Sequence, residues 1–319
     1  MRGWPLIKLL PQTTNFHFVK YARYAGVLSV ILCVASIVAC FTPGLNMGID
    51  FRGGASMEIT KPNGQVLELD QVRGAVADLG LGDVQVQGID SASSALVRFQ
   101  VPDNQSQTAV VQRVEAAIDQ AVGPVSYSGV NVVGSKVSGE LFTSGLMALG
   151  AAIVLMFAYI WFRFEPQFGF GAVAGLLHDV VLVFGLIVLF RFEFSLNMVA
   201  AILTVIGYSM NDTVVVFDRL RENLRKYKTM PLRDVIDLSL NETLSRTIIT
   251  GLTAVGVLAV LAIFGGEALF GFSVALMFGI IIGTYSSIYV GAPIILLWGV
   301  KRGGMDEAKP IKLGMASRP

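Results

Sequence analysis

One stretch decides what kind of protein this is: Gly207-Tyr208-Ser209-Met210-Asn211-Asp212-Thr213-Val214-Val215-Val216-Phe217-Asp218-Arg219. It closes an apolar run that begins near Leu196 and is long enough to cross a bilayer as a helix. Inside this run the carboxylic acid of Asp212 follows the amide of Asn211. A charged side chain near the middle of a membrane costs about 2.5–3.5 kcal/mol on insertion scales. We therefore expect Asp212 to face other helices or a water-filled path, and to have a polar partner.

The polar residues of this run share one side of the predicted helix. Spacings of three and four residues bring together Thr204, Tyr208, Asn211, Asp212 and Val215. One interpretation is that the acid carries a proton or another cation across the membrane. The other is that it only forms a hydrogen bond to a neighbouring helix. We favour the carrier, because a neutral asparagine would supply the structural bond at lower cost.

The composition is typical of a membrane protein with several spans. Of the 319 residues, 54% are hydrophobic and 15% are charged, and the mean hydropathy is +0.65, which is far from a soluble average. The net charge of +1, without a basic cluster interleaved with aromatic residues, gives no reason to expect a nucleic-acid partner. The two cysteines, Cys33 and Cys40, would lie about 10 Å apart along one helix, which is too far for a disulfide.

Six apolar blocks are long enough to span a membrane as helices. The first is expected at 24–42. It is too long for a typical signal peptide, and no cleavage site precedes Pro43-Gly44, so we interpret it as a retained anchor. The chain is thus predicted to be an α-helical polytopic membrane protein with six transmembrane helices. The other five spans fall within 139–300, at about 141–162, 167–190, 196–217, 246–265 and 269–299.

Residues 43–138, between the first and second spans, differ in composition, because charged residues return and short periodic patterns replace the apolar blocks. Alternating apolar residues predict strands, and spacings of three and four predict helices. The resulting order is β-α-β-β-α-β, a ferredoxin-like α+β domain in which two helices cover one face of a four-stranded sheet. The expected elements lie at 55–60, 69–79, 84–89, 95–101, 108–122 and 125–133.

Basic residues predict the orientation of the spans. The N-terminal segment 1–23 and the tail 301–319 are basic, whereas the connections on the other side hold few Lys or Arg residues. The positive-inside rule then places both termini in the cytoplasm and the 43–138 domain on the exported, periplasmic side. A loop is expected at 218–244, on the same side of the membrane as the termini. It carries Arg219, Arg221, Arg225, Lys226, Lys228 and Arg233.

The fifth span begins with a second candidate for ion handling. Arg246 and Thr250 share one face of that predicted helix, together with Thr253. A long arginine side chain entering from the cytoplasmic side can reach inward toward Asp212. We therefore expect Arg246 to compensate Asp212 when the acid is ionised, with Thr250 and Asn211 lining the same path.

The third span contains a further polar pair, His178-Asp179. No metal site is expected, because the other histidine, His17, lies outside the spans and no third ligand is suitably spaced. The pair is either a second proton-handling site or a structural polar contact between helices, and we favour the structural role. Glycines in the third and last spans, at 171, 175, 185, 279 and 283, are typical of close helix packing.

Motifs of common enzymes are absent from the sequence. It contains no G-x-x-x-x-G-K-[ST] phosphate loop, no H-E-x-x-H and no G-x-S-x-G. We therefore expect no enzyme and no cofactor. The remaining energy source is the membrane itself, since a unit charge crossing 100 mV exchanges about 2.3 kcal/mol.

Four motifs resemble those of one family. They are Gly48-Ile49-Asp50-Phe51-Arg52-Gly53-Gly54 after the first span, Leu177-His178-Asp179-Val180, the stretch 207–219, and Leu244-Ser245-Arg246-Thr247. Together they resemble the SecF branch of the SecD/SecF family of protein-export membrane proteins, which is related to the RND transporters. The resemblance covers nearly the whole chain.

The resemblance implies an RND-like half-bundle of helices in the bacterial inner membrane. It implies a SecD partner carrying the matching half, together with the SecYEG translocon, YajC and an unfolded polypeptide in transit. It assigns Asp212 as the acid that couples ion flow to export, Arg246 as its cationic neighbour and Thr250 as a lining residue. A half-bundle with a polar seam would expose that seam to lipid if it were alone, which independently favours a partner.

Three alternatives are open at this stage. A small-molecule or lipid exporter of the RND class would need a sizeable ligand cleft in the exported domain. A scaffold without transport would tolerate neutral residues at Asp212 and Arg246. An intramembrane hydrolase would need a second carboxylate near Asp212, for which Asp179 is the candidate. The sequence leaves the choice between H⁺ and Na⁺ open.

Overall fold

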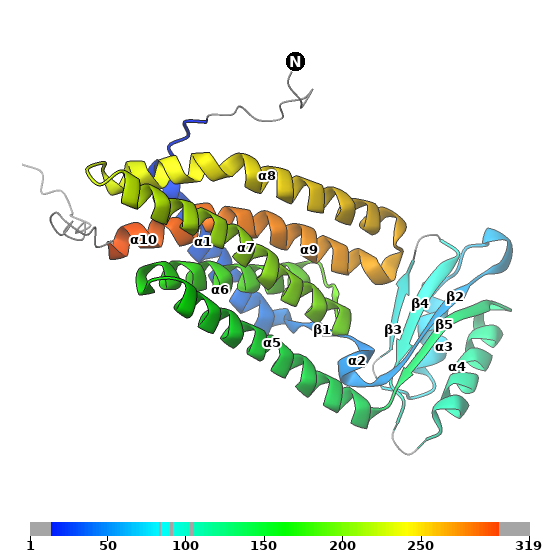
Figure 1. Ribbon diagram of the computed structural model, residues 1–319. Helices are drawn as coiled ribbons and strands as arrows, with labels where there is room; N and C mark the ends of the chain where they lie inside the picture. Colours follow the sequence, from blue (N-terminus) through cyan, green and yellow to red (C-terminus); the bar gives the residue numbers. More distant parts are fainter. Residues whose placement is uncertain (1–13, 83, 90–91, 103–104, 300–319) are drawn as a thin grey trace, which may run out of the picture.

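Six long helices form the larger part of the molecule in this computed structural model, which describes residues 14–82, 84–89, 92–102 and 105–299 (Figure 1). By length and composition each of the six is able to cross a membrane, as the sequence predicts. The sixth is α9, which continues through a π-helical turn into α10. The helices are α1 (Phe18–Ala39, followed by the π-helical turn Cys40–Gly44), α5 (Ser135–Arg163), α6 (Pro166–Leu189), α7 (Leu196–Lys226), α8 (Leu232–Phe264), α9 (Glu267–Ser286) and α10 (Ala292–Trp298), with the turn Ser287–Gly291 between the last two.

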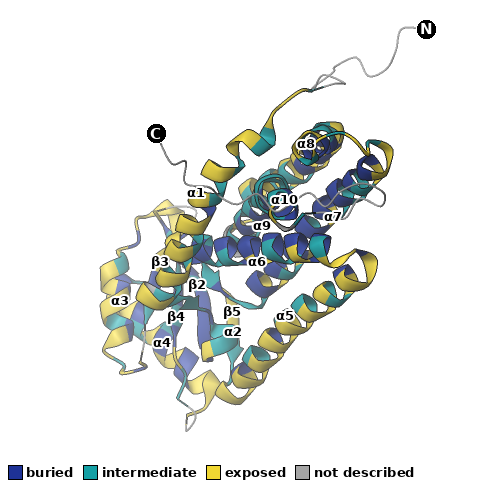
Figure 2. Cartoon of the chain, turned by 90° about the vertical axis from the view of Figure 1, so that its left-hand side faces the viewer, coloured by how far each residue is buried: buried dark blue, intermediate teal, exposed yellow. Residues whose placement is uncertain are grey.

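The helices differ strongly in burial. α6 and α7 are the most buried, and their facing residues form one apolar core with α9 and α10. In contrast, few residues of α1, α5 and α8 are fully buried, and α1 and α5 leave most of their apolar residues exposed, as Figure 2 shows. Exposed apolar helix surface is compatible with lipid or with another membrane-spanning chain.

A small α/β domain lies at one end of the bundle (Figure 1). Its order is β-α-β-β-α-β, as expected, and its sheet is antiparallel with strand order β3-β4-β2-β5. Alternate strand residues such as Met57 and Phe99 are buried against Val72 and Ile118 of the two helices. The elements are β2 (Gly54–Thr60), the 3-10 turn Pro62–Gly64, α3 (Leu69–Ala77), β3 (Gln85–Gly88), β4 (Ser94–Phe99), α4 (Gln107–Val122) and β5 (Ser126–Val133).

A second, two-stranded sheet joins this domain to the helices. The strand β1 (Asn46–Met47) pairs in parallel with β6 (Glu193–Phe194), which precedes α7. The short helix α2 (Ile49–Arg52) follows β1. None of these three elements is predicted by the sequence patterns, because each is too short to show a period.

Two expected boundaries are wrong. The segment 218–244 is not a loop, because α7 runs to Lys226 and α8 begins at Leu232. The first helix begins at Phe18 and not at Tyr24. In both cases hydropathy marks where the apolar run ends, while charged residues continue the helix into the polar region. Arg219, for example, pairs with Glu222 one turn on, which supports a helix. Most of the segment 1–23 and all of the tail 301–319 lie outside the described residues.

Candidate functional site

Asp212 lies at the contact between α7 and α9. It is only 3% exposed, and its Oδ2 accepts a hydrogen bond from Thr284 Oγ1 of α9 at 3.2 Å. Two glycines of α9 allow this close approach. A Cβ added at Gly283 would lie 2.9 Å from the Ser209 Cβ, and one at Gly279 would collide with Val205. The predicted packing role of these glycines therefore has a direct consequence, because it brings Thr284 to Asp212.

Arg246 lies on the neighbouring helix α8 and is exposed. It makes no hydrogen bond or ion pair with Asp212 within the described structure, although its charge acts on the acid at longer range. The two helices are held together beside the site by Tyr208, whose hydroxyl donates to the Thr250 carbonyl oxygen at 2.8 Å. The sequence thus predicts the right neighbouring helices, but the expected direct pair is not formed in this arrangement.

The other two predicted site residues do not turn into the bundle. Asn211 is exposed on α7, one residue before the buried acid. Thr250 is also exposed, and its hydroxyl bonds back to the carbonyl oxygens of Arg246 and Thr247, each at 3.0 Å. One turn before it, Thr247 is buried, at 4% exposure, and its hydroxyl has no hydrogen-bond partner among the described residues. This buried hydroxyl is a candidate functional group. It was not selected from the sequence, because the spacing of residues grouped Thr250 and not Thr247 with Arg246.

Asp179 forms a separate buried network on α6. The residue is 0% exposed. Its Oδ2 accepts hydrogen bonds from Ser209 on α7 at 2.5 Å and from Ser286 on α9 at 2.8 Å. Its Oδ1 lies 2.9 Å from His178 Nδ1. The carboxylate therefore connects three helices at one level of the bundle.

His178 is buried with the acid and retains one unused nitrogen. Its ring stacks on Tyr285 with centroids 5.9 Å apart, and its Nε2 has no hydrogen-bond partner in the part of the chain that the structure describes. The Tyr285 hydroxyl extends these polar contacts to α1, where it donates a hydrogen bond to the Ala25 carbonyl oxygen at 2.9 Å. This set of contacts fits a polar clamp between helices, and it leaves one nitrogen free to accept or donate a proton.

Polar residues near the end of α9 belong to the site but were not among the site residues expected from the sequence. Thr284 and Ser286 of α9 donate hydrogen bonds to Asp212 and Asp179, respectively, and Ser287, the first residue of the following π-helical turn, shares a hydrogen bond with Thr213. A signal exists, because Thr284-Tyr285-Ser286-Ser287 is a run of four polar residues inside an otherwise apolar span. Hydroxyl side chains inside a membrane helix commonly form hydrogen bonds across helices.

The chain matches known proteins over most of its length. The family profile "Protein export membrane protein SecD/SecF, C-terminal" matches residues 113–301, and "SecD/SecF GG Motif" matches residues 38–60. The chain belongs to the SecD/SecF family. It is 47% identical over 306 residues to the protein translocase subunit SecF of Cereibacter sphaeroides, covering 93% of this chain and 94% of that protein. It is 42% identical to SecF of Rhodobacter capsulatus, covering 93% of this chain and 92% of that protein.

Longer members of the SecD/SecF family contain a region that is similar to this chain. The SecDF protein of Brucella abortus is 39% identical over 97% of this chain, which corresponds to 41% of that protein. The crystal structure of SecDF from Thermus thermophilus, described as a translocon-associated membrane protein, superposes with a TM-score of 0.80 at 30% identity. This chain is covered to 91% and that chain to 40%. A SecDF structure described as a super-membrane-facing form superposes with a TM-score of 0.63.

Proposed function

We propose that this chain is the SecF-like half of an ion-driven protein-export complex in the bacterial inner membrane. In this proposal Asp212 takes up a cation from one side and releases it to the other, and the cycle moves the α/β domain. The domain then assists a polypeptide that is leaving the translocon. The family named by the comparisons supports the export role, and the contacts of Asp212 support the ion-carrying step.

The observation that carries the proposal is the environment of Asp212. A carboxylate that is 3% exposed and has one neutral donor, Thr284, is costly to keep charged, because desolvation of an unpaired ion amounts to several kcal/mol. The guanidinium of Arg246 is close enough to act on it but not paired with it. A small shift of α8 that forms the pair would favour the ionised acid. Movement away would favour the neutral one, and this alternation is what a carrier requires.

A membrane-spanning partner is supported by the surface beside the site. Thr204, Asn211, Arg246 and Thr250 are exposed on α7 and α8, although exposed polar groups are expensive in lipid. A second half-bundle would cover them, and we propose SecD for this role, since relatives of this chain occur fused as SecDF. SecYEG and YajC as further partners, and unfolded polypeptide as substrate, rest on the family alone.

The proposed orientation follows from charge. Most of the Lys and Arg residues lie in the segments 1–23, 218–244 and 301–319, so we place these segments in the cytoplasm. The α/β domain is then exported. One proton moving down a potential of 100 mV releases about 2.3 kcal/mol, so one or two ions per cycle supply enough free energy to shift a conformational equilibrium. A small-molecule exporter is less well supported, because the relatives are named as translocase subunits.

The decisive experiment measures export into proteoliposomes that contain the translocon, SecD and this chain. A pH gradient and a sodium gradient are applied separately. Asp212→Asn should remove the stimulation by one of the two gradients while the amount of assembled complex stays unchanged. Asp218→Asn is the matched control, because Asp218 lies on the same helix but is half-exposed and pairs with Arg163 at 2.7 Å. Full stimulation in Asp212→Asn would refute the carrier role.

A further inference from the structure

The α/β domain is attached to the helices at a junction that the ion-carrying step does not explain. The chain enters the domain through Gly53-Gly54 and leaves it at Gly134. These two places are neighbours, because a Cβ added at Gly53 would lie 3.3 Å from the Cα of Ser135. Both Gly53 and Gly54 have positive φ, at 72° and 124°, which L-residues with side chains rarely adopt. The domain is therefore attached to the helices through two chain segments that lie side by side, and such an attachment can act as a pivot.

The segment before the pivot is firmly bound to the start of α7. The backbone N–H of Gly48 donates to the Phe194 carbonyl at 3.0 Å, next to the β1–β6 pair. The Asp50 carboxylate accepts from the N–H of Leu196, the first residue of α7, at 2.9 Å. A carboxylate at a helix N-terminus is favourable because it satisfies a free N–H and complements the helix dipole. Phe51 packs on Phe194 with ring centroids 5.5 Å apart.

A third contact crosses the pivot. Arg98 projects from β4 of the α/β domain and forms an ion pair with Glu193, which lies in the connection that precedes α7. The two side chains are only 15% and 28% exposed, so the pair is largely shielded from water. Gly48 makes room for it, since a Cβ there would lie 2.5 Å from Glu193 Oε1. Arg98 thus connects the α/β domain to the segment before α7 without a covalent bond.

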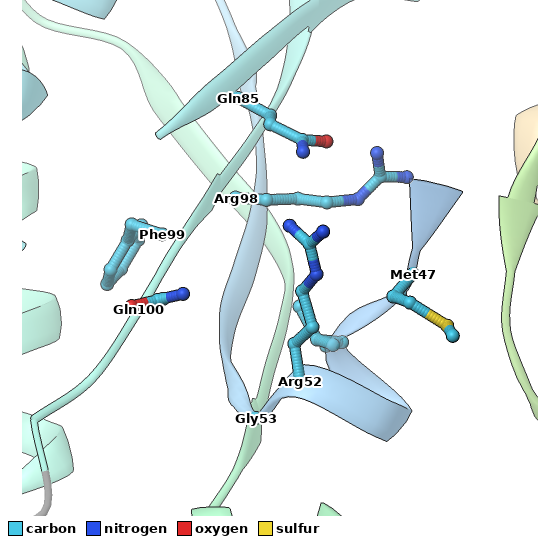
Figure 3. Close-up of a pocket in the computed structure, with 9 residues that line it drawn as sticks. Met47, Arg52, Gly53, Gln85, Arg98, Phe99 and Gln100 are labelled. Carbon is cyan, nitrogen blue, oxygen red and sulfur yellow. The ribbon is translucent and has the colours of Figure 1, made fainter. Parts of the chain in front are cut away.

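The surroundings of Arg98 allow this contact to open. Figure 3 shows Arg98 extending across the junction above Arg52, with the amide of Gln85 beside it. These side chains border a small, partly open pocket. An arginine that borders open space is able to leave its partner without moving the backbone, whereas the strand-paired segment around Gly48 is not.

We propose that Arg98 and Glu193 are positioning residues that couple the orientation of the α/β domain to the beginning of α7, the helix that carries Asp212. With the ion pair formed, the domain turns only together with α7. With the pair broken, the domain is free to rotate about Gly53-Gly54 and Gly134. The inference rests on the proposed function for its role in export, but the coupling itself is a property of this chain alone.

The coupling is tested on the full chain in lipid nanodiscs by pulsed electron-electron spin distances. Cys33 and Cys40 are replaced by alanine, and spin labels are placed at Gln112→Cys on α4 and Asn197→Cys on α7, both exposed positions. We expect one narrow distance distribution for the parent protein. Arg98→Glu and Glu193→Arg should each broaden it, and the double variant Arg98→Glu/Glu193→Arg should restore it. The control Arg113→Glu changes an exposed arginine of the same domain and should have no effect.

Unchanged distances in both single variants would overturn the coupling, and so would a double variant that stays broad. The link to export is measured with the same variants in the proteoliposome assay, where the single variants should lose gradient stimulation and the double variant should regain it. Normal stimulation in the single variants would overturn the positioning role. Failure of the proposed function is recognised separately, because it would appear as full stimulation in Asp212→Asn, while the distance measurement needs neither a gradient nor a translocon.

Discussion

Thr284 Oγ1 donates a hydrogen bond to the Asp212 carboxylate across the α7–α9 contact, at 3.2 Å. A hydrogen bond to a carboxylate stabilises its charged form, whereas desolvation opposes it. Thr284 therefore lowers the free energy of the state in which the acid has released its cation. Because the donor stands on a different helix, any movement of α9 relative to α7 changes this free energy.

Replacement of Thr284 by valine should slow gradient-driven export. Valine keeps the shape of the side chain but removes the donor, and a hydrogen bond to a charged group contributes about 1.5–3 kcal/mol. We expect the stimulated export rate to fall by about tenfold or more, since about 1.4 kcal/mol corresponds to a factor of ten. Thr284→Ser should retain most of the rate, because the hydroxyl is kept. Equal rates for the valine and serine variants would contradict the role of this bond.

Removal of the Asp179 carboxylate should weaken the helix bundle. Asp179→Ala removes an acceptor shared by Ser209 and Ser286. Ser286 retains the Gly283 carbonyl oxygen, but the buried Ser209 hydroxyl and His178 Nδ1 lose the partner that they have here, at a cost of about 1–3 kcal/mol for each group. Unfolding of the purified chain in mixed micelles of increasing denaturing detergent measures the loss. The control Asp218→Ala breaks a half-exposed pair with Arg163 and should cost less than about 1 kcal/mol. Equal stability of the two variants would show that the network contributes little.

An alanine at Gly283 should force α7 and α9 apart. The added Cβ would lie 2.9 Å from the Ser209 Cβ, and overpacking of a close contact costs about 1–3 kcal/mol. Gly207→Ala is the matched control on α7, because nothing lies within 4 Å of its added Cβ and alanine favours a helix by up to about 1 kcal/mol. The same detergent unfolding, applied to the chain alone, should show a loss for the first variant and none for the second.

The fold was largely accessible to sequence reasoning, because long apolar blocks and clear periods extend over many residues. The pattern could not show where helices end, since charged residues such as those after Phe217 continue a helix as readily as a loop. Nor could it show the β1–β6 pair. Each of these strands has two residues, and Asn46 meets Glu193 from far along the chain.

Only part of the candidate site could be predicted from the sequence. An acid in an apolar helix is conspicuous, so Asp212 and Asp179 stand out. Most of their hydrogen-bond partners are hydroxyls, on α9 for both acids and also on α7 for Asp179. A serine or threonine in a membrane helix carries little penalty that would mark it. The orientation of α8 about its own axis also matters, because it exposes Thr250 and buries Thr247 one turn before it. Which side of a helix faces its neighbours depends on how the helices pack. The spacing of residues within a single helix does not specify this.

The Arg98–Glu193 contact should depend on pH. Burial raises the pKa of Glu193 above its ordinary value of 4.5, and Arg98 on β4 opposes this while the nearby Asp50 on α2 adds to it. Since the pKa is higher in the folded than in the unfolded chain, the group stabilises the fold below 4.5 and loses this contribution as the pH rises through the folded value. Conversely, as the pH falls through that value, the carboxyl takes up a proton and the ion pair is lost.

The label distance between Gln112→Cys and Asn197→Cys should therefore stay narrow at neutral pH and broaden on acidification, with a midpoint above 4.5. Glu193→Gln mimics the protonated acid and should give the broad distribution at every pH, without a transition. A transition that persists in Glu193→Gln would assign the pH dependence to another group. If the parent protein keeps its narrow distribution down to the pH at which it unfolds, the ion pair does not hold the domain.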